Sequence, residues 1–325
     1  MKVSVAGKGI FRCCRNGRNF TENAVKKTMT SARPFVKWVG GKSQLLGKIR
    51  AKYPSKIKKY CEPFVGGGAV LFDILNNFSP EEVLINDINA ELINTYVQIK
   101  KNCSKMISEL SGLQNLYQSQ NAEKNKDFFY EKRSRYNELK LNDNERQKLE
   151  KAVLFIFLNK TCFNGLYRVN AKGIFNVPFN NAANPLICDE ENLKKCSALL
   201  QNVEMKTGDY RECKTFIDKD TFVYIDPPYR PLSDTASFTS YSQNRFSDTE
   251  QIELGKFLAE ISSKGAMVLA SNSDPKNTDK DDNFFDDLYE SFKIERVSAS
   301  RMINSNAKKR GAINELLITN IASAF

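Results

Sequence analysis

Short apolar runs separated by helical patterns recur along most of this chain. Residues 222–226 form a buried-strand pattern of apolar and β-branched residues that ends in an acid. Further strands are predicted at residues 60–65, 83–87, 203–206, 266–271, 292–297 and 314–321. Helices are predicted at residues 69–76, over most of 90–160 and at 248–262. This alternation predicts a mostly parallel α/β sheet, and the last two strands, with no helix between them, predict an antiparallel pair at one end.

Two prolines follow the strand at residues 222–226. Proline lacks an N–H and fixes φ, so Pro227 and Pro228 end the strand in a stiff turn. The turn presents the Asp226 carboxylate, the Pro227 carbonyl and the Tyr229 ring at the edge where open α/β sheets bind ligands. Two acceptors beside an aromatic face suit a planar base with an exocyclic amine. An ordinary strand end with a turn is the alternative for these four residues.

A strand, a glycine turn and a helix follow one another at residues 60–76, with Gly66 and Gly68 in the turn. This order lets the backbone approach a nucleoside closely and aims helix N–H groups at it. The next strand ends at Asp87, 21 residues after Gly66, which is the spacing at which a carboxylate meets ribose hydroxyls. The alternative is that Asp87 caps the helix that starts at Asn89.

Two further stretches carry candidate chemistry. A glycine turn between Trp38 and Lys42 resembles the end of a phosphate-binding loop, but Val36 stands where that motif needs glycine, so the turn is interpreted as part of a small-molecule pocket. Apolar and polar residues alternate from Asn159 to Phe179 through residues 170–173, which predicts a β-hairpin. A ribbon with Asn, Arg and Lys can enter a DNA major groove, although taken alone this stretch favours an ordinary exposed ribbon.

Composition narrows the chemistry. The 325 residues include no histidine, which excludes Ser-His and Cys-His nucleophiles and histidine-containing zinc sites, and the eight cysteines form no C-x-x-C pair, so no metal site is expected. The formal net charge is +11, of which residues 1–33 carry +7, so charge alone supports nucleic-acid binding weakly. The longest apolar run, residues 152–158, is far too short for a membrane span, and we expect a cytoplasmic protein.

Six motifs occur in one order from about Pro34 to the C-terminus. They are Phe35-Val36-Lys37-Trp38-Val39-Gly40-Gly41-Lys42, Glu62-Pro63-Phe64-Val65-Gly66-Gly67-Gly68, Asn86-Asp87, Phe163-Asn164-Gly165-Leu166-Tyr167-Arg168, Gly208-Asp209-Tyr210 and Asp226-Pro227-Pro228-Tyr229. Together they resemble the motifs of the Dam-type DNA adenine-N6 methyltransferases, especially the branch that modifies GATC.

The resemblance implies a Rossmann-like, S-adenosylmethionine-dependent methyltransferase sheet at residues 33–100 and 200–325. It implies a helical and β-hairpin target-recognition insert at 101–199, between the second and fourth strands; residues 1–32 are interpreted as a flexible basic extension. The implied cofactor-binding residues are Trp38, Lys42, Phe64, Gly66, Gly68, Asp87, Asp209, Tyr210 and Asp226. The implied catalytic residues are Asp226, Pro227, Pro228 and Tyr229. The implied DNA-binding residues are Phe163, Asn164, Leu166 and Arg168.

The expected function is therefore transfer of a methyl group to adenine N6 in double-stranded DNA by base flipping, at GATC. Residues 180–183 depart from the Gly-Arg-Tyr-Lys run of that branch, which leaves the recognition sequence open. A cytosine-N4 methyltransferase and a catalytically inactive DNA-binding module are the alternatives. A monomer is expected, and a cognate restriction endonuclease acting independently is a partner to consider.

Overall fold

The computed structural model describes residues 31–142, 144–230, 246–300 and 312–321. Most of the basic extension, up to residue 30, falls outside these ranges. The described body begins slightly before the predicted boundary at residue 33, because Ala32 is buried and its N–H donates to Asn76 Oδ1 at 3.1 Å.

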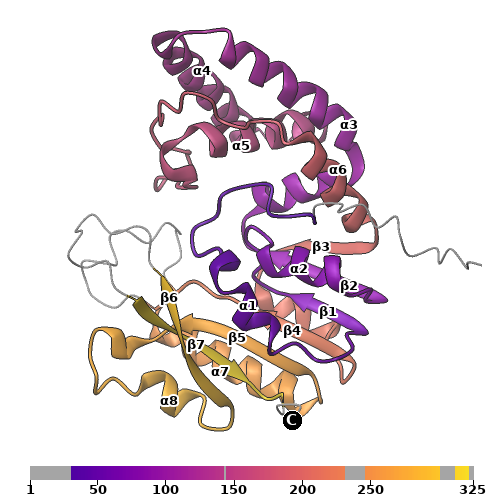
Figure 1. Cartoon of the computed structure of the whole chain (residues 1–325), viewed down its shortest axis with the longest axis vertical. Helices are drawn as coiled ribbons and strands as arrows, with labels where there is room; N and C mark the ends of the chain where they lie inside the picture. The colour runs from indigo at the N-terminus through magenta and orange to yellow at the C-terminus, as the bar shows by residue number, and fades with distance from the viewer. Residues whose placement is uncertain (1–30, 143, 231–245, 301–311, 322–325) are drawn as a thin grey trace, which may run out of the picture. The chain divides into compact units, whose positions relative to one another are not determined.

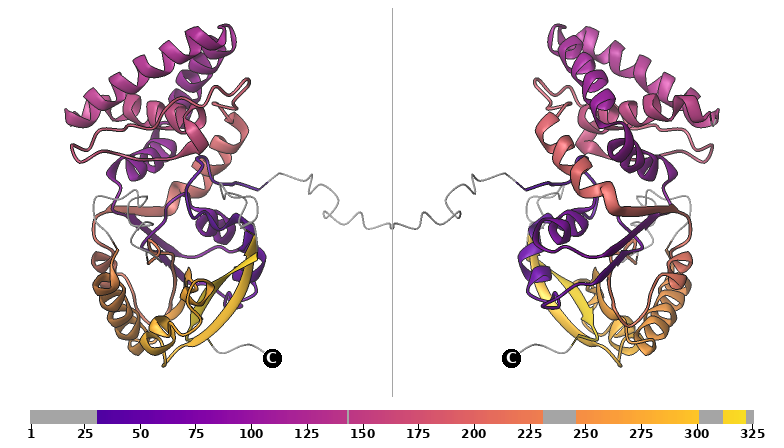
Figure 2. Two further views of the ribbon diagram at one scale, coloured as in Figure 1. Left: turned by 90° about the vertical axis from the view of Figure 1, so that its left-hand side faces the viewer. Right: turned by 90° about the vertical axis from the view of Figure 1, so that its right-hand side faces the viewer.

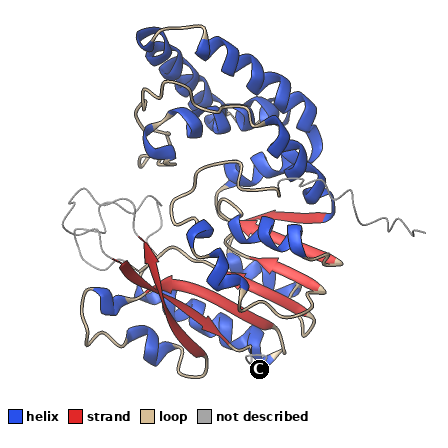
Figure 3. Ribbon diagram, in the orientation of Figure 1, coloured by secondary structure: helices blue, strands red, loops and turns tan. Residues whose placement is uncertain are grey.

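Seven strands form one sheet (Figure 3). They are β1 (Lys59–Glu62), β2 (Glu82–Asp87), β3 (Val203–Thr207), β4 (Thr221–Ile225), β5 (Met267–Ser273), β6 (Lys293–Ser300) and β7 (Ala312–Thr319). Their spatial order is β3-β2-β1-β4-β5-β7-β6, with β1 to β5 parallel and β7 antiparallel to both β5 and β6. The predicted mostly parallel sheet with an antiparallel pair at one end is confirmed.

The strand order reverses between β1 and β4. From β1 the chain builds outward through β2 and β3, and from β4 it builds in the opposite direction. Such a switch point separates the connections on the two sides and opens a crevice at the carboxyl ends of the strands. The strand predicted at 60–65 ends earlier, at Glu62, since Pro63 has no N–H for the ladder. The N–H of Val65 instead donates to the carbonyl of Asn86, at 3.0 Å.

Helices cover both faces of the sheet (Figure 1). Side chains alternate along β4, so that Phe222 and Tyr224 face one layer and Val223 and Ile225 face the other. The first layer contains α1 (Leu46–Arg50), α2 (Ala69–Asn77), the start of α3 (Ala90–Gln118) and α6 (Glu190–Leu199). The second layer contains α7 (Asp248–Ser263) and α8 (Phe284–Leu288), and the side views show α7, in orange, along its face of the sheet (Figure 2).

A helical insert lies between β2 and β3, so it ends one strand earlier than the resemblance implies. It comprises the second part of α3 with α4 (Ala122–Leu141) and α5 (Lys148–Thr161), followed by a hairpin. Helix α3 is kinked at Asn102 (φ −129°, ψ 29°), close to the boundary expected at residue 101. The hairpin has isolated bridges between Cys162 and Phe179 and between Val169 and Phe175 rather than a continuous ladder.

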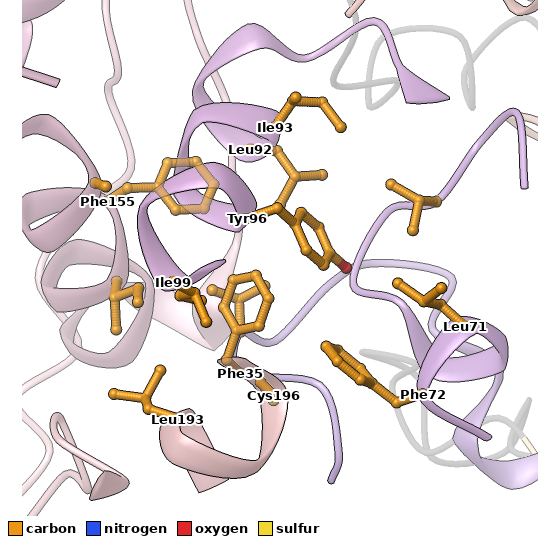
Figure 4. Close-up of a cluster of buried hydrophobic side chains, with 14 of the residues drawn as sticks. Phe35, Leu71, Phe72, Leu92, Ile93, Tyr96, Ile99, Phe155, Leu193 and Cys196 are labelled. Atoms are coloured by element: carbon orange, nitrogen blue, oxygen red, sulfur yellow. The ribbon is translucent and has the colours of Figure 1, made fainter. Parts of the chain in front are cut away.

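The far boundary of the insert differs from the expected residue 199. Helix α6 packs with α2 and α3 rather than with α4, and Leu193 and Cys196 lie in the same apolar cluster as Phe72 and Tyr96 (Figure 4). This helix therefore belongs to the layer that covers the sheet. Periodicity alone could not show this, because an amphipathic helix of ten residues carries no signal of which neighbour its apolar face meets.

Residues 32–42, here called the strap, contact both the helical layer on the sheet, through Phe35, and the insert, through Lys37. Phe35 anchors the strap, with its ring edge-on to Tyr96 at 4.7 Å and to Phe72 at 6.3 Å between centroids (Figure 4). Aromatic rings prefer this geometry, and Phe35 is only 3% exposed. The packing of Phe35 in the apolar core thus fixes the position of the strap. Within the described ranges, no helix is both long and apolar enough to cross a membrane.

Candidate active site

The Asp226 carboxylate lies at the carboxyl end of β4, beside the switch point. Its Oδ1 accepts from Lys42 Nζ at 2.8 Å and from Ser271 Oγ at 3.0 Å. Its Oδ2 accepts no hydrogen bond from any described residue, and the same holds for the Pro227 carbonyl. The Pro228 carbonyl, in contrast, accepts from Gln251 Nε2 at 3.2 Å. Among the described residues, Asp226 Oδ2 and Pro227 O are therefore the two acceptors of the turn that have no donor.

The charge of Asp226 depends on its neighbours. Burial raises the pKa of this carboxyl above its ordinary value, and the Lys42 ammonium and the Ser271 hydroxyl offset part of that rise. Lys42 is itself only 4% exposed, and its Nζ donates to the Gly40 carbonyl at 2.9 Å. The strap therefore supplies the cation that favours an ionised Asp226.

The Tyr229 ring is held at both its face and its hydroxyl. Lys42 Nζ lies 4.7 Å from the ring centroid, and the hydroxyl donates to Glu315 Oε2 at 2.7 Å. Burial and the carboxylates of Asp226 and Glu315 raise the pKa of the Tyr229 phenol well above its ordinary value, so the hydroxyl remains a donor. The aromatic face is thereby fixed next to the two acceptors of the turn.

The glycine turn after β1 depends on glycine at two positions. Gly66 (φ +48°) and Gly68 (φ +74°) adopt left-handed backbone conformations, and a Cβ on Gly66 would lie 2.8 Å from Trp38 Cδ1. A Cβ on Gly68 would lie 2.4 Å from the Tyr96 hydroxyl, which donates to the Gly66 carbonyl at 3.1 Å. Helix α2 begins at this turn with no side-chain cap from Gly68, and the Glu62 carboxylate accepts from the N–H of Leu71, so the N–H groups of Ala69 and Val70 are the candidates for a ligand.

Asp87 holds this turn from the end of β2. Its Oδ2 accepts from the N–H of Gly66 at 3.0 Å, and its Oδ1 accepts from the N–H of Asn89 at 2.9 Å. The cap of α3 is Asn89, whose side chain accepts from Leu92 N, so the alternative role of Asp87 as the helix cap is not what the structure shows. A carboxylate offers about four acceptor positions, which leaves room for ribose hydroxyls.

Asp209 and Tyr210 follow β3, the strand next to β2. Asp209 Oδ1 accepts from Arg211 Nε at 2.7 Å, and this guanidinium lowers the pKa of the carboxyl. Tyr210 stacks on Phe64 with centroids 5.2 Å apart and planes 30° apart. The predicted cofactor-binding residues thus lie at the carboxyl ends of four adjacent strands, β3, β2, β1 and β4, except for Trp38 and Lys42, which lie on the strap.

The predicted DNA-binding residues lie on the loop and hairpin after α5. Phe163 is 48% exposed, and Asn164 has a left-handed backbone (φ +54°). Leu166 and Arg168 are half-buried, and Arg168 Nε donates to Asn176 Oδ1 at 2.7 Å. No described contact joins these four residues to Asp226.

Two contacts connect this loop to the strap. Asn159 of α5 exchanges hydrogen bonds with the N–H and carbonyl of Lys37 and donates to the Gly165 carbonyl, each at 2.8 Å. Tyr167 stacks on Trp38, with centroids 6.0 Å apart. Trp38 therefore lies against both the Gly66–Gly68 turn and the loop.

Sequence reasoning missed several residues of this site. The missed residues are Gln251, Ser271, Glu315 and Asn159. Of these four residues, only Glu315 could have been identified from the sequence, because a carboxylate within the apolar run of β7 requires a buried partner.

The sheet and its edge define an α/β fold whose candidate site lies at the switch point, at the carboxyl ends of the strands. The family model described as D12 class N6 adenine-specific DNA methyltransferase matches residues 38–303. The chain belongs to this family of adenine-specific DNA methyltransferases. The expected adenine-N6 activity is confirmed, which decides against both the cytosine-N4 enzyme and the inactive module.

Three relatives match over most of their length. The type II methyltransferase M.MjaIII of Methanocaldococcus jannaschii is 47% identical over 89% of this chain and 99% of its own. The type II methyltransferase M1.LlaDCHI of Lactococcus lactis is 36% identical over 92% and 99%. A protein named DNA adenine methylase from Haemophilus influenzae is 34% identical over 88% and 92%.

Proposed function

We propose that this chain transfers a methyl group from S-adenosylmethionine to adenine N6 in double-stranded DNA, at GATC, through the turn from Asp226 to Tyr229. The observation that supports the role of the turn is that the two oxygens of the Asp226 carboxylate have different partners. Lys42 and Ser271 hold Oδ1, while Oδ2 and the Pro227 carbonyl remain as acceptors beside the Tyr229 ring.

The cofactor fits the edge of the sheet on physical grounds. The Gly66–Gly68 turn packs directly against Trp38 and Tyr96, and the start of α2 beside it offers N–H groups to a ligand. Asp87 retains acceptor capacity for ribose hydroxyls, and Phe64 and Tyr210 provide apolar rings. Trp38, Lys42, Asp209 and Asp226 complete the proposed set. When bound, the cofactor supplies an electrophilic methyl group, which none of the protein side chains can provide.

The protein groups act on the amine of the target base. That nitrogen is a weak nucleophile because its lone pair is delocalised into the ring. Asp226 Oδ2 and Pro227 O accept hydrogen bonds from its two N–H groups and draw the nitrogen towards tetrahedral geometry. This geometry frees the lone pair for attack. The base must first leave the duplex, which costs a few kcal/mol. Stacking on Tyr229 offsets part of this cost, at about 1–3 kcal/mol.

Recognition of DNA is assigned to Phe163, Asn164, Leu166 and Arg168. Exposed Phe163 is suited to apolar contact with bases, and Arg168 can donate two hydrogen bonds to guanine O6 and N7. In the DNA-free structure Arg168 Nε donates to Asn176 Oδ1. Two relatives are named type II methyltransferases, which favours a role beside a restriction endonuclease that acts independently. We assign the active form as a monomer in the cytoplasm.

One experiment tests both activity and site. The full chain and its Asp226→Ala variant are expressed in a host without DNA adenine methylation, and the host DNA is sequenced for modified bases. N6-methyladenine within GATC is expected for the wild type and none for the variant, while DNA binding persists because phosphate contacts dominate affinity. Methylation at an unrelated sequence would refute the GATC assignment, and a fully active Asp226→Ala variant would remove Asp226 from the mechanism.

A further inference from the structure

Glu315 occupies an unusual position in the sheet. It lies within β7, opposite Ser273 of β5 and Val297 of β6, and the next residues, Leu316 and Leu317, are fully buried. The Glu315 side chain is only 14% exposed. A carboxylate in such surroundings is unfavourable unless hydrogen bonds and opposite charge compensate for lost water.

Both kinds of partner come from the active site. Glu315 Oε2 accepts the Tyr229 hydroxyl at 2.7 Å and lies 3.9 Å from Lys42 Nζ. The Lys42 ammonium therefore lies between two carboxylates, with Asp226 on its other side at 2.8 Å. Glu315 is thus connected to both the aromatic face and the cation of the proposed site without adjoining either in sequence.

These contacts have two consequences for Tyr229 and Asp226. The prolines fix only the backbone of Tyr229, and the hydrogen bond to Glu315 fixes the far end of its ring. Glu315 also acts on Asp226, because its negative charge raises the pKa of the Asp226 carboxyl while the shared Lys42 ammonium lowers it. A carboxylate of higher pKa is the more basic acceptor for the target amine.

We propose that Glu315 is a positioning residue for methyl transfer, which orients the Tyr229 ring for the flipped base and shares Lys42 with Asp226. This inference rests on the proposed function of the turn. It assigns to the antiparallel end of the sheet a part in the reaction, rather than the closure of the sheet alone.

Two variants separate the two contacts. Glu315→Gln keeps an acceptor for the Tyr229 hydroxyl but loses the charge that attracts Lys42, whereas Glu315→Leu loses both. Glu295→Gln is the matched control, because Glu295 lies on β6, is 42% exposed and pairs with Lys52 at the surface. Circular dichroism and urea unfolding establish that each variant is folded, and the isosteric Gln variant keeps the test valid if the Leu variant is not.

The rate of a single turnover is measured with saturating S-adenosylmethionine and a duplex carrying the target site. Glu315→Leu is expected to slow the reaction roughly ten- to hundred-fold, as misplacement of a reacting group does, and Glu315→Gln by a smaller factor. Cofactor affinity by calorimetry should stay close to that of the wild type. Fluorescence of 2-aminopurine at the target position should change in the Leu variant and be retained in the Gln variant.

Combination with Tyr229→Phe gives the decisive result. If Glu315 acts through the Tyr229 hydroxyl, the Tyr229→Phe change slows the wild type and the Gln variant but adds little to the Leu variant. Additive effects in the Leu variant, or folded Glu315 variants that react as fast as the wild type, would overturn the proposal. Absence of N6-methyladenine with the wild type would instead reject the proposed function itself.

Discussion

Replacement of Lys42 by methionine tests the electrostatics of Asp226 most directly. Methionine keeps much of the apolar stem but removes the ammonium 2.8 Å from Asp226 Oδ1. Because that ammonium lowers the pKa of Asp226 against the effect of burial, the pKa should rise further in the variant. In the proposed mechanism Asp226 accepts the amine in its ionised form, so activity is lost as pH falls through this pKa. The acid limb of the rate profile should therefore move to higher pH.

The size of the shift follows from the geometry. Two unit charges 2.8 Å apart interact by roughly 6 kcal/mol at an effective dielectric constant of about 20. This is an upper limit, since Glu315 attracts the same ammonium from 3.9 Å. Opposite charges at such distances lower carboxyl pKa values by about 1–3 units, equivalent to ~1.4–4 kcal/mol. We expect the acid limb to move up by an amount in that range.

The assay is single-turnover methylation as a function of pH. Saturating S-adenosylmethionine separates the effect on Asp226 from any loss of cofactor affinity. Lys58→Met is the matched control, because Lys58 pairs with Asp220 at 3.1 Å on the surface, where both side chains are more than 40% exposed. Coincident acid limbs for the wild type and Lys42→Met would refute the assigned role of the ammonium.

Three further perturbations follow from the described contacts. Burial raises the pKa of Glu62 in the folded state well above its unfolded value, so the folded state loses stability as pH rises from the unfolded pKa to the folded pKa. Glu62→Gln removes this titration and should flatten that fall in the free energy of unfolding, measured with urea. Gly66→Ala should cost at least ~1–2 kcal/mol of stability and weaken cofactor binding, because its φ is +48° and its Cβ would strike Trp38. Arg168→Ala should relax discrimination at one base pair by ~1–3 kcal/mol in methylation profiling of near-cognate sites.

Each of these has a result that contradicts it. Parallel pH profiles for Glu62→Gln and the wild type would mean that the carboxyl titrates alike in both states. Gly47→Ala is the control for Gly66→Ala, since nothing lies within 4 Å of a Cβ there and alanine should stabilise helix α1 by roughly 0.5–1 kcal/mol. Uniformly weaker methylation at all sites would assign Arg168 to a phosphate rather than to a base.

The sequence predicted the ends of the central strands well. Strand β4 carries a continuous apolar run and stops at two prolines, and β2 stops at Asp87, so both acids could be placed at the carboxyl edge. These signals are local: the residues that end a strand also fix where its last side chain lies.

Contacts between distant segments could not be predicted in this way. Lys42 meets Asp226 across 184 positions, and Glu315 reaches Tyr229 only because β7 pairs with β5 in the register that sets Ser273 opposite Glu315. Strand register and the packing of a helix such as α6 depend on the whole core. The acids of the site were therefore predictable, whereas the groups that tune them were not.

The bridge made by Asn159 limits how this enzyme can be re-engineered. Exchange of the insert between relatives is an obvious route to new sequence preferences. Asn159 belongs to the exchanged segment, but its hydrogen-bonding partner, Lys37, belongs to the recipient, as does Trp38, on which Tyr167 stacks. A chimaera in which these residues do not match would lose the hydrogen bonds of Asn159 and the Trp38–Tyr167 stacking, next to the Gly66–Gly68 turn. A successful exchange therefore has to replace two separate segments of the chain together, the strap and the insert.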